Sequence, residues 1–422
     1  MQKSNEILAQ VRNLMKENNI DVYIVPDTDP HMNEYVPDHW RIISWLTGFT
    51  GSSATVVITA AGAGLWTDSR YELQAREQLA GSGYELMQPV STDKNSYLSW
   101  IDLNVPAGSV IGFDGRLLAS ARYKKLKDAA DSRGFSINHE SDFITPLWTQ
   151  RPALPATKAF EHSLEFAGAD RFEKITAVRN EMSKAGVNYH LLTAPDDIMW
   201  LLNIRGGDIR YSPVLLSYAI IGEEQILLFA DEMKIPFRTA KEFDEIGVIM
   251  LPYEEASGML SSLDAGTSVL VSPATTSCDL VMSIPEGVRI VEDLSIPSKL
   301  KAIKNSVEAV SLGKAMIRDG IALTRFFHWV ELNTGTVPMS EMSLTEKLNH
   351  FRSEQENFLS LSFSSIVAWN EHSALPHYNA IPGCDSVIGQ DGLLLIDSGS
   401  QYPEGTTDIT RTVPIGRPSE KQ

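Results

Sequence analysis

The sequence predicts an α/β fold, with mixed α+β character towards its C-terminal end, and a division into three domains. The chain has 422 residues, which is too long for one compact domain of usual size. Helical and strand-like patterns alternate along the first part of the chain, and their order is repeated in the second part. Hydrophobic residues make up 43% of the chain and charged residues 21%, so we expect it to fold throughout.

The first domain is expected to span residues 1–147. Its first segment predicts an amphipathic surface helix and no export signal, because five apolar residues follow helical spacing: Ile7, Leu8, Val11, Leu14 and Met15. Residues 22–25 form a short apolar run closed by Pro26, which predicts a buried strand. A proline-rich stretch from Pro146 to Pro155 then predicts a linker or domain seam.

The second domain, residues 148–298, is expected to duplicate the first. In the first region, Trp45 precedes a predicted strand at residues 55–59 and a second strand that ends at Asp68. In the second region, Trp200 precedes predicted strands at residues 216–221 and 227–231. The spacing differs between the two copies, so we expect a loose structural duplication without a fixed repeat.

The third domain is expected to span residues 299–422. Asn305 and Glu308 predict the capped start of a helix that runs to about Leu332, and Ser343-Leu-Thr-Glu346 predicts a second helix towards Glu356. Strands are predicted at residues 362–368 and, after a turn at Asp391-Gly392, at residues 393–396.

Charge and composition exclude several classes of protein. The formal net charge is −18 and no Lys/Arg cluster is present, which disfavours nucleic acid as a partner. Only Cys278 and Cys384 occur, so we expect reduced core thiols and no disulfide framework. No run of about 18 apolar residues is present, so we expect a cytoplasmic protein without a membrane partner.

Asp397 and Asp408 are the first candidate site residues. An apolar strand ends in Asp397, the chain reverses through Pro403 and Gly405, and Asp408 enters the next β-rich run. If the flanking strands pair as a hairpin, the two carboxylates lie close together, and a divalent cation would relieve their repulsion. The alternative is that both are ordinary turn-forming aspartates, which the spacing alone does not exclude.

The whole segment 393–414 resembles the metal-binding hairpin of the pita-bread metallopeptidases, the family that includes aminopeptidase P, prolidase and methionine aminopeptidase. The resemblance covers nearly the whole chain and is greatest to the three-domain form of aminopeptidase P. It extends to Thr50-Gly-Ser-Ser53, Trp66-Thr-Asp-Ser-Arg-Tyr71, Asp197-Ile-Met-Trp-Leu-Leu-Asn-Ile-Arg-Gly206, Ser217-Tyr-Ala-Ile-Ile-Gly222, Lys301-Ala-Ile-Lys-Asn-Ser-Val-Glu308 and Leu361-Ser-Phe363.

This resemblance implies two creatinase-like α/β domains followed by a partial pita-bread catalytic domain. Asp397 would chelate one divalent ion, expected to be Mn²⁺, and Asp408 would bridge it to a second ion. Such a two-metal site activates a hydroxide that attacks the scissile carbonyl. His377 matches a family histidine that contacts the substrate; without the family match, a satisfied loop histidine is an equal alternative.

Other charged side chains carry weaker expectations. His328 is expected in the core or at an interface, and His372 is expected to be a polar loop residue. Arg205 and Arg210 could contact a substrate or a partner subunit, although a turn with solvated charges is the simpler interpretation.

The sequence departs from the family at its end. The family draws one further His and two Glu ligands from a stretch that should follow Gln422, so we expect this chain to be an inactive fragment of the enzyme. We also expect strand 393–396 to face water unless another segment or a partner covers it.

The function implied by the resemblance is an aminopeptidase that removes the N-terminal residue from peptides with proline in the second position. A pocket shaped for proline's fixed φ would exclude most other residues. The resemblance also implies a homodimer. The alternative from another class is an inactive, peptidase-like module that binds peptides or proteins; within the enzyme class, prolidase is a rival that the two N-terminal domains disfavour.

Overall fold

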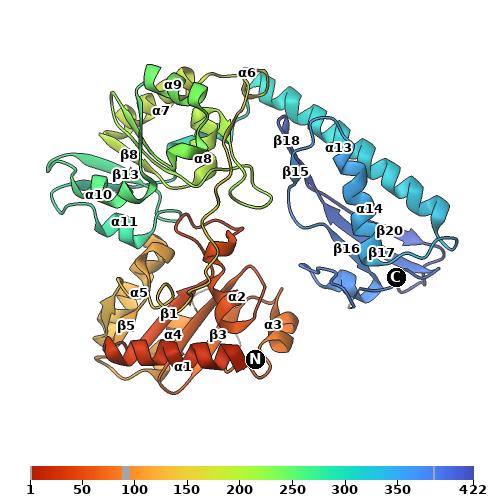
Figure 1. Cartoon of the computed structure of the whole chain (residues 1–422), viewed down its shortest axis with the longest axis horizontal. Coiled ribbons are helices and arrows are strands. Elements are labelled where there is room, and N and C mark those ends of the chain that lie inside the picture. Colours follow the sequence, from red (N-terminus) through yellow and green to blue (C-terminus); the bar gives the residue numbers. More distant parts are fainter. Residues whose placement is uncertain (1, 88–95, 384) are drawn as a thin grey trace. The chain divides into compact units, whose positions relative to one another are not determined.

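The computed structural model describes residues 2–87, 96–383 and 385–422, which form two compact units (Figure 1). The first unit comprises residues 1–161, 171–209 and 214–302, and the second comprises residues 162–170, 210–213 and 303–422. The predicted domain boundary at residue 298 falls within a helix, and the chain passes into the second unit four residues later. The boundaries at residues 147 and 298 stay predictions.

The first sheet of the first unit has the strand order β4-β3-β2-β1-β5-β6. Its strands are β1 (Val22–Pro26), β2 (Ala54–Thr59), β3 (Ala63–Thr67), β4 (Glu85–Met87), β5 (Val110–Gly112) and β6 (Ser136–Asn138). The helices and 3-10 turns of this region are α1 (Gln2–Glu17), η1 (Asp38–Trp40), α2 (Ile42–Thr47), α3 (Glu72–Gln78), α4 (Ser96–Asn104), η2 (Gly115–Leu117) and α5 (Ser120–Arg133).

The second sheet of this unit has the order β12-β11-β10-β8-β13-β14. Its strands are β8 (Tyr189–Leu192), β10 (Tyr218–Ile221), β11 (Ile226–Phe229), β12 (Val248–Leu251), β13 (Ser268–Val271) and β14 (Arg289–Glu292). A two-stranded pair accompanies it: β7 (Phe160–Glu161) and β9 (Ile204–Arg205). The helices and 3-10 turns are α7 (Arg171–Ala185), α8 (Pro195–Leu202), η3 (Glu232–Lys234), α9 (Phe237–Glu245), η4 (Tyr253–Glu255), α10 (Ala256–Ser261), α11 (Cys278–Met282) and α12 (Ile296–Lys301).

The two six-stranded sheets have the same topology. In the first, β1 is antiparallel to β2 and parallel to β5; in the second, β8 is antiparallel to β10 and parallel to β13. The outer pairs correspond as well, since β3 and β4 are parallel, as are β11 and β12. The predicted duplication of two α/β domains is therefore confirmed at the level of strand order and direction.

The apolar residues that predicted the N-terminal helix form part of the core of the first sheet. Helix α1 buries Ile7, Leu8, Val11 and Met15 against the first sheet, while Leu14 is half-buried. The amphipathic helix predicted at the N-terminus is thus confirmed.

No helix in the part of the chain that the structure describes is long and apolar enough to span a bilayer.

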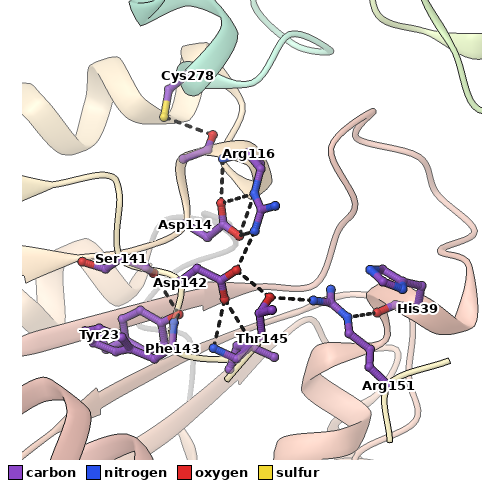
Figure 2. A network of polar contacts seen from close by, with 12 residues as sticks. Tyr23, His39, Asp114, Arg116, Ser141, Asp142, Phe143, Thr145, Arg151 and Cys278 are labelled. Atoms are coloured by element: carbon purple, nitrogen blue, oxygen red, sulfur yellow. Dashed lines mark hydrogen bonds and ion pairs between the residues drawn. The ribbon is translucent and has the colours of Figure 1, made fainter. Parts of the chain in front are cut away.

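A polar network fixes the proline-rich stretch onto the first sheet (Figure 2). The Nη2 atom of Arg116 donates to Asp114 at 2.6 Å and to Asp142 at 2.7 Å. Asp142 also accepts hydrogen bonds from two backbone amides that follow it. Farther along, Arg151 donates from Nε to the carbonyl of His39 at 2.7 Å. The predicted linker therefore begins as an anchored segment of the first unit.

Cys278 is a free thiol with no exposed surface, and its Sγ donates to the carbonyl of Gly115 at 3.3 Å. Burial is the main reason that the pKa of this thiol is raised to about 12. The prediction of a reduced core thiol is confirmed for Cys278. Cys384 lies outside the described residues.

The second unit packs its two long helices against strands, and a short third helix precedes them in the chain. Its helices are α6 (Leu164–Ala167), α13 (Ser306–Asn333) and α14 (Glu341–Ser353). One sheet has the order β15-β18-β19, formed by β15 (Ser360–Leu361), β18 (Ser400–Tyr402) and β19 (Gly405–Thr406). The other has the order β16-β17-β20, formed by β16 (Ile366–Trp369), β17 (Gly392–Ser398) and β20 (Ile409–Ile415), and η5 (Asn370–Ala374) follows β16.

Two predicted elements of this unit need correction. Helix α13 begins after Asn305 with the predicted capping box to Glu308, but helix α14 begins earlier than predicted. Its N-cap is Ser340, which pairs with Ser343 in a capping box that lacks the acidic residue used as the signal. The strand predicted at residues 362–368 is confirmed only for residues 366–368, which belong to β16; residues 362–365 form no strand, and β15 lies before them in another sheet.

Candidate functional site

Asp397 lies near the end of β17, the central strand of its sheet. It pairs with Ile366 of β16 on one side and with Thr410 of β20 on the other. Side chains of a strand alternate between its two faces, and Leu394 and Ile396 are buried in the hydrophobic cluster formed with α13 and α14. Asp397 therefore lies on the face opposite to these helices.

The same alternation bears on the expectation that residues 393–396 face water unless another segment covers them. Leu394 and Ile396 have no exposed surface, whereas Leu393 and Leu395 are half-buried. The condition attached to that expectation is met on one face, where another part of the chain covers Leu394 and Ile396. Helices α13 and α14 cover that face within the unit.

Asp408 stands directly before β20, and the predicted pairing of its strand with β17 is confirmed over seven residue pairs. Desolvation raises the pKa of the Asp408 carboxyl, and the charge of Asp397 and a hydrogen bond to Asp397 raise it further. Because Asp408 is also partly open to solvent, the carboxyl pair is accessible from outside the unit. The hairpin thus brings the two carboxyl groups into contact.

A divalent cation fits this pair of carboxyl groups. The Oδ1 atom of Asp397 is buried and has no hydrogen-bond partner, and a buried anionic oxygen without a partner is costly. Carboxylate oxygens are the donors that hard divalent ions prefer. However, no group of three or more His, Cys, Asp or Glu side chains among the described residues could hold a metal ion, so no third side chain of these types joins the pair there.

The structure places His377 in the turn between η5 and β17, where its side chain is exposed. Its role as a substrate contact stays a prediction. His372 lies five residues earlier within η5 and is half-buried. Its Nδ1 atom is 2.9 Å from Oε1 of Glu341, so the prediction of an ordinary polar loop residue missed a specific buried partner.

Glu341 is the residue of this region that sequence reasoning missed. It is the first residue of α14, and its side chain is completely buried. A buried carboxylate is rare unless it is paired or hydrogen-bonded, so its partners matter. The available signal was an acidic residue directly after a helix N-cap serine, but the misplaced start of α14 concealed it.

Other predicted candidates lie apart from the carboxyl pair or have structural partners. His328 is exposed, so a core position for it is wrong; an interface role stays a prediction. Arg205 donates from Nη1 to the carbonyls of Met199 and Ile204, and is therefore not a freely solvated charge. The guanidinium of Arg210 is exposed and lies 4.7 Å from the ring centroid of the adjacent tyrosine.

The turn beside these arginines is also less exposed than expected. Asp208 is only 5% exposed and forms an ion pair with Lys234, with Nζ 2.9 Å from Oδ2. The same Oδ2 accepts a hydrogen bond from the amide of Leu216. A turn of solvated charges is therefore the wrong description of Asp208.

Comparison with known proteins assigns the class. Residues 7–138 and 150–308 each match a Creatinase/Prolidase N-terminal domain, and residues 311–422 match metallopeptidase family M24. Two creatinase-type domains followed by an M24 domain define a metallopeptidase of the pita-bread class, which confirms the predicted fold class.

Individual relatives define the family more closely. The chain is 34% identical to a probable Xaa-Pro aminopeptidase P of Talaromyces stipitatus, covering 99% of this chain and 65% of the relative. It is 35% identical to the Xaa-Pro aminopeptidase ApepP of Drosophila melanogaster, covering 99% of this chain and 70% of that protein. The chain thus spans about two thirds of the length of these curated relatives, and it belongs to the Xaa-Pro aminopeptidase P family.

A solved structure agrees with this assignment. The chain superimposes on the X-prolyl aminopeptidase of Caenorhabditis elegans with a TM-score of 0.93 at 31% identity, covering 100% of this chain and 71% of that one. That protein is described as a cytosolic enzyme with a di-nuclear active site.

Proposed function

We propose that this protein is a metal-dependent aminopeptidase that hydrolyses the N-terminal Xaa-Pro bond of peptides. The observation that carries the proposal is the contact between the carboxyl groups of Asp397 and Asp408, together with the buried, unpartnered Oδ1 of Asp397. The names of the relatives and the di-nuclear site of the C. elegans enzyme support it.

In this proposal, the carboxylates of Asp397 and Asp408 would help to hold two divalent ions, with Mn²⁺ as the expected metal. When bound, such a pair supplies an activated water and polarises the scissile carbonyl. Further ligands would have to complete the coordination, since no third His, Cys, Asp or Glu side chain joins the pair among the described residues.

The substrate would be a peptide with proline in the second position. His377 would contact it, because its position matches that of a substrate-contacting histidine in the family that the sequence resembles, and its side chain is exposed. Proline has a fixed φ and no amide hydrogen, so a pocket formed around it selects it by shape.

The first experiment is a hydrolysis assay on protein expressed from the complete reading frame. We expect Mn²⁺-dependent release of the first residue from an Xaa-Pro-Xaa tripeptide, loss of the activity with a chelator, and no release from the Xaa-Ala-Xaa analogue. Cleavage of neither peptide, with metal supplied, would instead support the alternative of an inactive peptide-binding module.

Substitution of Asp408 tests the metal assignment itself. We expect D408N to weaken Mn²⁺ binding at least about tenfold, because a neutral amide replaces one of the two anionic donors. Mn²⁺ titration followed by electron paramagnetic resonance measures this. The matched control is D391N, which changes an exposed aspartate directly before β17, at the opposite end of that strand from Asp397. Equal Mn²⁺ affinities of D408N and D391N would rule out Asp408 as a ligand.

We also propose that the protein acts in the cytoplasm as a homodimer. The first part is supported by the description of the C. elegans relative as cytosolic. The second rests on the family resemblance, and light scattering coupled to size-exclusion chromatography tests it. A monomeric mass at micromolar concentration would contradict the dimer.

A further inference from the structure

The carboxylate of Glu341 connects three separate parts of the chain. Its Oε1 atom accepts from the amide of Trp369 at 2.7 Å, and its Oε2 atom accepts from the hydroxyl of Tyr378 at 2.6 Å and from the amide of Ser386 at 2.7 Å. The Nδ1 atom of His372 lies 2.9 Å from Oε1 and 3.0 Å from Oε2. Four donors therefore converge on one buried side chain.

This arrangement fixes the charge of Glu341 and the tautomer of His372. The amides and the hydroxyl all donate, so both carboxyl oxygens act as acceptors, as they do in an ionised carboxylate. His372 must then carry its proton on Nδ1 to complete the set. Hydrogen bonds to an ionised acceptor are about twice as strong as neutral ones, which offsets the cost of burying the charge.

The anchors lie on both sides of His377. Trp369 and His372 precede it in the chain, and Tyr378 follows it directly. The rings of His372 and Tyr378 stack with centroids 4.5 Å apart, so the two anchors also support each other. Glu341 therefore limits the conformations open to the turn that presents His377.

The far end of the same segment is fixed to the start of α14. The amide of Glu341 donates to the carbonyl of Ser386 at 3.1 Å, and the amide of Ile388 donates to the carbonyl of Met339 at 2.9 Å. A β-bridge between Ser340 and Val387 lies between these bonds. Both ends of the His377 turn are thus attached to one helix terminus.

We propose that Glu341 is a positioning residue for the proposed peptidase, holding the His377 turn in the conformation in which His377 contacts the substrate. The catalytic role of Glu341 rests on the proposed function, because it requires that the protein is a peptidase. Its structural part, that Glu341 orders the turn, can be measured without activity.

The test compares E341Q with E346Q in protein expressed from the complete reading frame. Both substitutions lie on α14, but Glu346 is exposed. In E341Q an amide NH₂ group replaces one carboxylate oxygen, so one of the hydrogen-bond donors around it loses its acceptor. We therefore expect faster hydrogen exchange at the backbone amides of Trp369 and Ser386. We expect kcat/KM for the proline tripeptide to fall about 100-fold while Mn²⁺ affinity stays unchanged. E346Q should behave as wild type in all three measurements.

A double-mutant cycle of E341Q and H377A separates a positioning effect of Glu341 on His377 from a general loss of stability. If Glu341 acts through His377, E341Q should reduce kcat/KM much less in the H377A background than in the wild type. Should E341Q fail to fold, Y378F removes only one of the donors and is expected to lower kcat/KM about tenfold.

Three results would overturn the proposal or its premise. Hydrogen exchange in E341Q equal to that in E346Q would refute the ordering role, whether or not the protein is a peptidase. Equal losses from E341Q with and without His377 would refute the positioning role. Failure of the wild-type protein to cleave either the Xaa-Pro-Xaa or the Xaa-Ala-Xaa tripeptide would overturn the proposed function. The catalytic role of Glu341 would then be refuted as well, even if hydrogen exchange showed that Glu341 orders the turn.

Discussion

The buried ring of His190 shows how one residue is held in one protonation state. Its Nδ1 atom lies 3.1 Å from the carbonyl of Leu270, and the amide of Ile296 donates to its Nε2 atom at 3.1 Å. One ring nitrogen donates and the other accepts, which is possible only for neutral imidazole. Burial is the main cause that lowers the pKa of His190 from 6.5 to about 4.

This environment predicts a pH dependence of stability. Because the folded-state pKa is lowered, the contribution of His190 is fully present above pH 6.5 and is lost as the pH falls to about 4. At about 1.4 kcal/mol for each pKa unit, roughly 3 kcal/mol of unfolding free energy is at stake. H190Q keeps a donor and an acceptor but does not titrate, so urea denaturation at pH 4 to 7 should show a flatter pH dependence for H190Q than for wild type.

The exposed His328 supplies the control for this measurement. H328Q removes an imidazole without disturbing the buried contacts of His190, so its pH dependence should follow that of wild type. An H190Q slope that matches wild type over this pH range would contradict the prediction.

Residues with local signals could be predicted from sequence, and residues with long-range partners could not. Asp397 and Asp408 could be proposed because the segment around them resembles a known metal-binding hairpin, whereas their spacing beside turn residues left ordinary turn aspartates open. Glu341 was missed because its partners lie between 28 and 45 residues away and meet only in the folded unit. The burial of Asp208 could not be foreseen for a similar reason, since its cation comes from a different turn.

At the scale of elements, helices α13 and α14 are joined by a buried ion pair. Arg352 donates from Nε and Nη2 to the two carboxylate oxygens of Asp319 at 2.8 and 2.9 Å, and both side chains are completely buried. An exposed pair joins the same helices, with Arg325 Nη2 2.8 Å from Glu354 Oε2. The two pairs allow a buried and an exposed ion pair between the same two helices to be compared.

We expect D319N to lower the free energy of unfolding by about 3 kcal/mol or more, because the buried guanidinium of Arg352 then lacks a counter-charge. E354Q, which changes the exposed pair, should cost about 0.5 kcal/mol or less. Chemical denaturation of the two variants measures the difference. The apolar double variant D319L/R352M should recover most of the loss, since it removes both charges together; equal costs for D319N and E354Q would contradict this account.

Elements with continuous patterns were predicted better than short ones. The β17–β20 pairing and the α13 capping box follow from residues adjacent in sequence, and both predictions are confirmed. The start of α14 was wrong because its capping box uses Ser343 where Glu is the usual signal. The strand predicted at residues 362–368 began four residues too early, because strands of two and four residues carry too little periodicity to fix their bounds.

At the scale of the whole molecule, the duplicated sheets lie in one compact unit and the carboxyl pair in the other. Each hydrophobic cluster lies within one of the two units. Those built on the two six-stranded sheets contain only residues of the first unit, and the cluster on α13, α14 and β17 contains only residues of the second. The fold class could be predicted because the repeated strand order appears in the sequence, whereas the grouping of two predicted domains into one unit depends on side-chain contacts between them.

This division predicts how metal acts on stability. A ligand that binds only the folded state stabilises it, by about 2.7 kcal/mol at 100 times its dissociation constant. Because Asp397 and Asp408 both belong to the second unit, Mn²⁺ should raise the melting temperature of that unit's transition and leave the first unit's unchanged. Differential scanning calorimetry with Mn²⁺ and with chelator measures this, and D397N should abolish the shift. A Mn²⁺ shift that persists in D397N would place the ion elsewhere, and an equal shift of both units would mean that they do not unfold independently.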